Sequence, residues 1–203
     1  MAPSVSNSIP STDRDDVISN PVTGERLRFL QRREDTDGEL LQMELWATPK
    51  LMGPIEHLHP NQEETFRIQS GELVIKIDGR TRRLGPGDEA TVPRETAHTH
   101  WVESDEPVCA IVEFRPALRT EEGFETLFSL GRDGRLNKKG LPSILQLAAM
   151  HGEYSNHMYL SSLPVVVQKA GCALLAPLAR LMGYRATYPD HEFPDAADSE
   201  PDR

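Results

Sequence analysis

The sequence predicts an all-β sandwich or barrel followed by an α-helical extension, and three observations support this prediction. Short runs of alternating apolar and polar residues recur from Val22 to Phe114, which is the period of half-buried strands. Turn-forming residues such as Asp78 and Gly79 separate these runs, as tight hairpins require. After Pro116 the apolar residues recur at helical spacing instead.

The composition is that of a globular chain. Its 203 residues include 22 Lys+Arg and 32 Asp+Glu, for a formal net charge of −10, and 37 % are hydrophobic. The acidic balance argues against nucleic acid or an anionic membrane as a partner. Cys109 and Cys172 are far apart, and the first residues have neither an apolar stretch nor a basic start. We therefore expect free thiols and a cytoplasmic protein.

The chain divides into four segments by composition and period. Residues 1–17, rich in Ser, Pro and Asp, are expected to be a disordered leader. Residues 18–117 contain the predicted strands, and residues 118–186 contain the helices. Residues 187–203 are acidic and contain prolines, and we expect a disordered tail.

Three helices are predicted in the extension. Thr120 could cap the first, which would run to Gly131. Pro142 stands at the start of the second. The third, around residues 164–182, would be kinked or broken near Pro177 because proline lacks a backbone donor.

The apolar stripes of these helices need a surface to cover them. We expect them to pack on the barrel or on a second protomer in a homodimer, and to restrict access to the barrel interior. A membrane-surface position for residues 163–183 is the alternative, although Lys169 and Arg180 argue against a spanning helix. The residues expected to be buried are Phe124, Leu127, Phe128, Leu145, Leu147, Val166, Leu174 and Leu178.

Four of the seven histidines form two H-x-H pairs in the strand-rich region, His57 with His59 and His98 with His100. Residues two apart in a strand point to the same face, so each pair projects two imidazoles together. The alternative interpretation is a set of solvated histidines at strand edges.

A carboxylate is expected to join these imidazoles. In the run EETFRIQSG, Glu64 alternates with Phe66 and Ile68, so Glu64 should point inward and Glu63 outward. A buried carboxylate needs a partner. A divalent metal held by imidazoles would supply one.

These residues resemble two motifs of the cupin superfamily. The segments are GPIEHLHPNQEETFRIQSG, similar to H-x-H-x4-E-x6-G, and GDEATVPRETAH, similar to G-x5-P-x-G-x2-H. Glu95 stands where the family has glycine, and Val102 stands where it has asparagine. The matched residues are His57, His59, Glu64 and Gly71 in the first motif and Gly87, Pro93 and His98 in the second.

The resemblance implies a double-stranded β-helix, or jelly-roll barrel, of the small quercetinase-like type. It also implies that His57, His59, Glu64 and His98 bind one divalent transition metal per chain. Fe, Mn, Ni, Co and Zn all suit this ligand set. His100 shares the face of His98 and is the candidate catalytic residue, as an acid–base group or substrate contact. Its alternative role is to fill the barrel rim.

The function expected from this resemblance is that of an enzyme acting on a small organic molecule chelated to the metal. Dioxygenase-type oxidation and isomerisation or cyclisation are both open. The alternative is a non-catalytic module that binds or senses a small molecule. Glu113, on the last strand, is expected to face solvent rather than to line the pocket.

Overall fold

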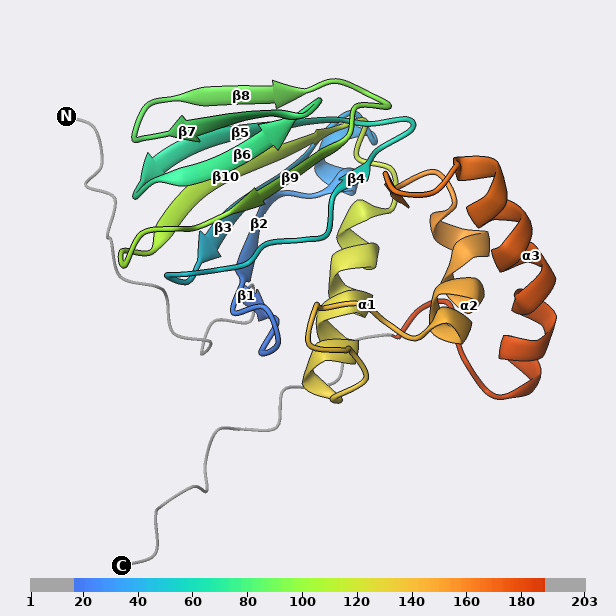
Figure 1. Ribbon diagram of the computed structural model, residues 1–203. Coiled ribbons are helices and arrows are strands. Elements are labelled where there is room, and N and C mark those ends of the chain that lie inside the picture. Colours follow the sequence, from blue (N-terminus) through green and yellow to red (C-terminus); the bar gives the residue numbers. More distant parts are fainter. Residues whose placement is uncertain (1–16, 189–203) are drawn as a thin grey trace, which may run out of the picture.

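The computed structural model describes residues 17–188, and its strands form two antiparallel sheets that face each other (Figure 1). The sheet orders are β1-β2-β3-β10-β5-β8 and β11-β4-β9-β6-β7. This is the jelly-roll cupin barrel with a helical extension that the sequence predicts. The strands are β1 (Val17–Ser19), β2 (Arg26–Gln31), β3 (Leu41–Ala47), β4 (His57–Leu58), β5 (Glu63–Ser70), β6 (Leu73–Ile77), β7 (Arg80–Leu84), β8 (Glu89–Val92), β9 (His98–Trp101), β10 (Val108–Arg115) and β11 (Tyr159–Leu160).

The predicted leader and tail lie outside the described residues, apart from their inner ends. Val17, which we assigned to the leader, begins β1. Tyr188, assigned to the tail, donates a hydrogen bond from its hydroxyl to Gln146 Oε1 at 2.9 Å.

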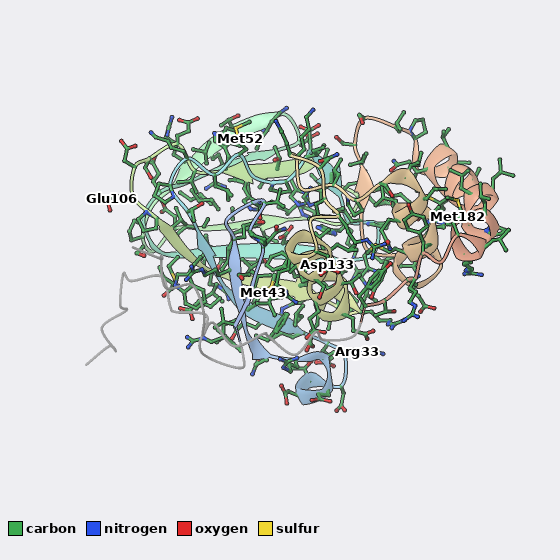
Figure 2. All side chains as sticks on the ribbon, turned by 90° about the horizontal axis from the view of Figure 1, so that it is seen from below. Arg33, Met43, Met52, Glu106, Asp133 and Met182 are labelled. Carbon is green, nitrogen blue, oxygen red and sulfur yellow. The ribbon has the colours of Figure 1, made fainter. Side chains whose placement is uncertain are left out.

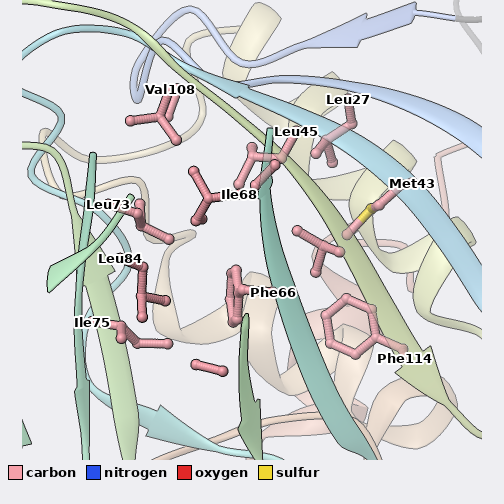
Figure 3. Close-up of a cluster of buried hydrophobic side chains, with 14 of the residues drawn as sticks. Leu27, Met43, Leu45, Phe66, Ile68, Leu73, Ile75, Leu84, Val108 and Phe114 are labelled. Atoms are coloured by element: carbon pink, nitrogen blue, oxygen red, sulfur yellow. The ribbon is translucent and has the colours of Figure 1, made fainter. Parts of the chain in front are cut away.

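The core lies between the two sheets, as Figure 3 shows. Phe66 and Ile68 of β5 face Ile75 and Leu84 of the other sheet, and all four are fully buried. In β5 these positions alternate with the polar residues Thr65, Arg67 and Gln69, which is why one face of this strand is apolar. The alternation carries Glu64 to the inner face along with Phe66.

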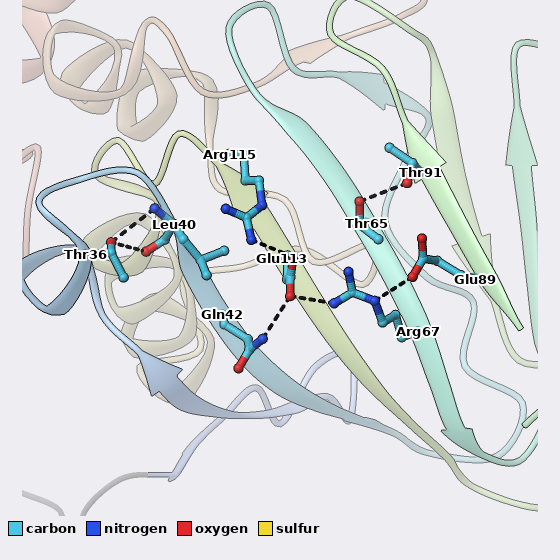
Figure 4. A network of polar contacts seen from close by, with 9 residues as sticks. All are labelled: Thr36, Leu40, Gln42, Thr65, Arg67, Glu89, Thr91, Glu113 and Arg115. Carbon is cyan, nitrogen blue, oxygen red and sulfur yellow. Dashed lines mark hydrogen bonds and ion pairs between the residues drawn. The ribbon is translucent and has the colours of Figure 1, made fainter. Parts of the chain in front are cut away.

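The outer face of the larger sheet carries a polar network around Glu113 (Figure 4). The Glu113 carboxylate accepts hydrogen bonds from Gln42, Arg67 and Arg115, at 2.8, 2.5 and 3.2 Å. These side chains cover it to 5 % exposure, so the expectation that it faces solvent was wrong. Burial alone would raise the pKa of Glu113, but Arg67 and the other donors lower it below 4.5.

The extension contains α1 (Thr120–Arg132), α2 (Ile144–Tyr154) and α3 (Val165–Leu181), and a short 3-10 helix (Arg33–Thr36) lies within the barrel region. Phe128 of α1 is part of the barrel core, with Phe124 and Leu127 packed against it. Helices α2 and α3 pack on each other around a separate small cluster of alanines.

Helix boundaries differ from the predicted ones in three respects. Arg119, not Thr120, occupies the first capping position, and the Thr120 hydroxyl instead accepts a hydrogen bond from Gln62 Nε2 at 2.6 Å. Ser143 caps α2 by accepting a hydrogen bond from the Gln146 amide. Helix α3 continues through Pro177 without a break, which a proline permits at the loss of one backbone hydrogen bond.

The prediction that the apolar side chains of α3 are buried was wrong for a single chain. Val166, Leu174 and Leu178 are 76 %, 80 % and 48 % exposed. Met182, just beyond α3, also lies at this outer side of the molecule in Figure 2, far from Met43 in the barrel. No helix within residues 17–188 is both long and apolar enough to cross a bilayer.

Candidate metal centre

Four side chains predicted to bind metal converge inside the barrel. His57 begins β4, Glu64 lies in β5, His98 begins β9, and His59 follows β4 directly. All four are at most 7 % exposed. One possible ligand atom from each lies within 4.8 Å of the others. The structure thus brings together all four of these residues.

Strand pairing explains this convergence. His57 and His98 are direct partners across the antiparallel β4–β9 pair, and their ring centroids are 4.3 Å apart. Glu64 comes from the opposite sheet, where it pairs with Phe114 and Val92. Its side chain is buried while that of Glu63 is half-buried, as the alternation of the strand requires.

Each of the three imidazoles is held by a backbone carbonyl oxygen at Nδ1. His57 donates to Ile55 at 2.8 Å and His98 to Thr96 at 3.0 Å. His59 donates to His157, in the segment before β11, at 2.5 Å. A carbonyl can only accept, so each Nδ1 carries hydrogen and the Nε2 atom is the one available to a metal.

The Glu64 carboxylate sets the electrostatics of the cluster. Its Oε2 lies 2.8 Å from His98 Nε2 and 3.4 Å from His59 Nε2. Burial alone would raise the pKa of Glu64, but the two imidazoles lower it well below 4.5. Burial opposes protonation of His98 too, yet Glu64 raises the pKa of His98 above 6.5. Both shifts favour the charged forms of these two groups, Glu64 as carboxylate and His98 as imidazolium.

His57 behaves in the opposite way. Burial, followed by the neighbouring imidazoles of His98 and His59, lowers its pKa from 6.5 to about 3. This ring therefore stays neutral over the physiological range, which is the state that binds metals.

The donor set fits a divalent transition metal. His59 Nε2 is buried and has no hydrogen-bond partner, a costly arrangement that a cation accepting its lone pair would relieve. Three imidazole nitrogens and one carboxylate oxygen are ligands typical of first-row transition metals. Binding of a metal would also replace the proton shared by His98 and Glu64.

His100 lies apart from this cluster. It shares the inner face with His98, as predicted, but its ring packs beside Phe66 at 5.1 Å between centroids. The side chain is 7 % exposed, and neither ring nitrogen has a hydrogen-bond partner. The Glu25 carboxylate lies 3.8 Å from His100 Nε2.

Two contacts at His59 were not anticipated from the sequence. The first contact is made by the main-chain carbonyl of His157 in the extension. No pattern of side chains in the sequence predicts such a contact. Glu95 donates its backbone N–H to the His59 carbonyl at 2.8 Å and has φ +59°. The family's glycine at this motif position was the available signal for that turn, since glycine favours positive φ.

A jelly-roll barrel with three imidazoles and a carboxylate inside it is the architecture of a metal-binding cupin. Residues 48–114 match the family model for the Cupin domain. The chain therefore contains a cupin domain.

Two curated relatives and one solved structure each match about half of this chain. It is 31 % identical over 84 residues to quercetin 2,3-dioxygenase of Bacillus subtilis, covering 41 % of this chain and 25 % of that protein. It is 30 % identical over 110 residues to a probable oxidoreductase, patJ, of Aspergillus clavatus, covering 51 % and 34 %. The matches thus span a quarter to a third of the length of these relatives. A solved RmlC-like cupin from Shewanella frigidimarina is 22 % identical with a TM-score of 0.46, covering 55 % of this chain and 93 % of that one.

Proposed function

We propose that this protein is a metal-dependent enzyme that acts on a small organic molecule by chelating it to the metal. The observation that carries the proposal is the buried cluster of His57, His59, Glu64 and His98, whose ligand atoms lie within 4.8 Å of one another. Three carbonyl oxygens orient the imidazoles of this cluster. Such preorganisation is what a bound metal requires of its ligands.

Dioxygenase-type oxidation is the reaction class that we place first, and isomerisation or cyclisation second. The similarity to quercetin 2,3-dioxygenase and to a probable oxidoreductase supports this order. A metal held by these residues would supply Lewis-acid or redox chemistry to a chelated substrate.

The chain's own side chains have distinct parts in this proposal. Glu64 and the three imidazoles hold the metal, and the rings of Phe66 and Phe114 exclude water from the barrel interior. His100 is the candidate contact to the substrate, because both of its ring nitrogens are buried and free to form a hydrogen bond.

The proposal is tested by metal analysis of protein purified without added metal, followed by oxygen-uptake assays with β-diketones, catechols and other phenols. Iron together with oxygen uptake that is lost in Glu64→Gln supports oxidation. Zinc without uptake, but with conversion of an enediol or diketone, supports isomerisation. A metal-loaded protein that converts none of these compounds contradicts the enzyme proposal.

A non-catalytic module that binds a small molecule is the second candidate. The depth of the cluster favours it, because every ligand is at most 7 % exposed, which leaves little ligand surface open to a substrate. Saturable binding of a chelator-like compound, measured by calorimetry without any product, would distinguish this candidate.

We also propose a homodimer and a cytoplasmic location. The exposed apolar side chains of α3, including Val166 and Leu174, support the first. The free thiols Cys109 and Cys172 support the second. Light scattering should give a dimer that Leu174→Glu converts to a monomer, with Arg82→Glu as an exposed control. A monomer that floats with anionic vesicles would instead favour the membrane-surface alternative.

A further inference from the structure

The three imidazoles of the candidate metal centre differ in where their supporting carbonyls come from. His57 and His98 each donate from Nδ1 to the residue two positions earlier, Ile55 and Thr96. These contacts are local and belong to the barrel. The carbonyl that holds His59 comes from His157, 98 positions further along the chain.

The segment that supplies this carbonyl is attached to the barrel immediately after His157. Strand β11 pairs antiparallel with β4, so that Tyr159 lies opposite Leu58 and Leu160 opposite His57. Ser161 then donates its backbone N–H to the Glu56 carbonyl at 3.1 Å. The extension thus adds a strand to the sheet that carries His57 and His98.

The His157 side chain fixes the same segment from the other side. Its Nε2 accepts a hydrogen bond from the Arg119 backbone N–H at 2.9 Å, at the start of α1. The His157 N–H donates to the Tyr154 carbonyl at 3.0 Å, at the end of α2. The carbonyl of His157 is therefore held between two helices and a strand.

We infer that His157 is a positioning residue for the metal centre, and that the helical extension completes this centre by fixing the ring of His59. Without the carbonyl, His59 could place its proton on Nε2 and lose the lone pair that faces Glu64. Outer contacts of this kind typically change metal affinity by about 10- to 100-fold. This inference rests on the proposed metal site.

The test is a double-mutant cycle on the full-length chain, read by Co²⁺ affinity. His157→Ala removes the acceptor for Arg119 and loosens the carbonyl, and we expect about tenfold weaker binding or more. His157→Gln, whose amide oxygen can accept the same hydrogen bond, should retain most of the affinity. Leu145→Ala, in the α2–α3 cluster, is the control for general loss of stability and should bind Co²⁺ normally.

The decisive comparison is with His59→Ala. If His157 acts through His59, then His59→Ala with His157→Ala should bind Co²⁺ no more weakly than His59→Ala alone. Nitrogen-15 NMR of the metal-free wild type should also show His59 protonated at Nδ1, with the Nε2 form gained in His157→Ala.

Three results would overturn the inference. Fully additive losses in the cycle, or equal losses in Leu145→Ala, would show a general structural effect while leaving the metal site intact. A wild-type chain that binds no Co²⁺ would overturn the metal site and this inference together.

Discussion

The backbone carbonyl oxygen of His157 lies 2.5 Å from Nδ1 of His59, although the two residues are 98 positions apart. One belongs to the helical extension and the other to the barrel. Their contact places the extension against the candidate metal centre, and the Glu95 N–H holds the main-chain carbonyl of the same residue, His59. That the helices restrict access to the metal remains a prediction.

Metal affinity should fall as the pH is lowered, with an onset above pH 6.5. Glu64 raises the pKa of His98 above 6.5, so below that pKa the metal must displace one proton from His98. His57 adds nothing in this range, because its pKa is about 3. One displaced proton corresponds to about tenfold weaker binding per pH unit.

Co²⁺ titrations between pH 8 and pH 5 measure this dependence. In Glu64→Gln the acidic partner of His98 is gone, and the onset should move to lower pH although the affinity itself is weaker. An affinity that stays constant from pH 8 to pH 5 would remove the reason for assigning histidines to the site.

Replacing Glu95 by glycine should stabilise the protein. Glu95 has φ +59°, a left-handed conformation that costs a side-chain-bearing residue roughly 1 kcal/mol relative to glycine. Part of this gain is offset by the greater chain entropy of glycine in the unfolded state. We expect a net gain of about 0.5 kcal/mol in the free energy of unfolding.

Urea denaturation measures this gain. Arg94→Gly is the matched control, because Arg94 is a neighbouring exposed residue without a positive φ, and its replacement should destabilise slightly. Equal effects of the two substitutions would contradict the assigned strain at Glu95.

Gly53→Ala should destabilise the barrel more than Gly79→Ala does. Both glycines have positive φ, +69° and +74°. A Cβ at Gly53 would lie 1.6 Å from the His100 carbonyl oxygen, whereas one at Gly79 meets nothing within 4 Å. We expect a loss of about 1 kcal/mol for Gly79→Ala from φ alone, and about 1–3 kcal/mol more for Gly53→Ala from the clash.

Thermal or urea unfolding of both variants gives the comparison. Losses of the same size would mean that the loop at Gly53 moves freely away from β9. That outcome would contradict the close packing of this loop on the strand that carries His98 and His100.

The sequence predicted the barrel and the inner cluster because both depend on local alternation. Two-residue periodicity places His57 with His59 and Glu64 with Phe66 on defined faces. Register then brings these faces together, and the cupin motif spacing identifies the pairing. A two-residue alternation of apolar and polar side chains can be recognised from the residue types alone.

Features that depend on long-range packing were not predicted. Nothing in the side chains near His157 signals a carbonyl aimed at His59, and the two residues of β11 are too few to show a period. The coverage of Glu113 by Arg67 and Arg115 depends on neighbouring strands. The exposure of Val166 and Leu174 was not predicted. An apolar helix face indicates that its side chains are buried, but it does not identify the surface that covers them.

Metal stoichiometry in a set of single variants tests the central claim most directly. Calorimetric titration with Co²⁺ should give one ion per chain for the wild type and for Glu63→Ala, whose side chain lies on the other face of β5. His59→Ala and Glu64→Ala should lose most of the bound metal. A Glu63→Ala chain that binds no metal, beside a Glu64→Ala chain that binds one ion, would contradict the assignment of this cluster as the metal centre.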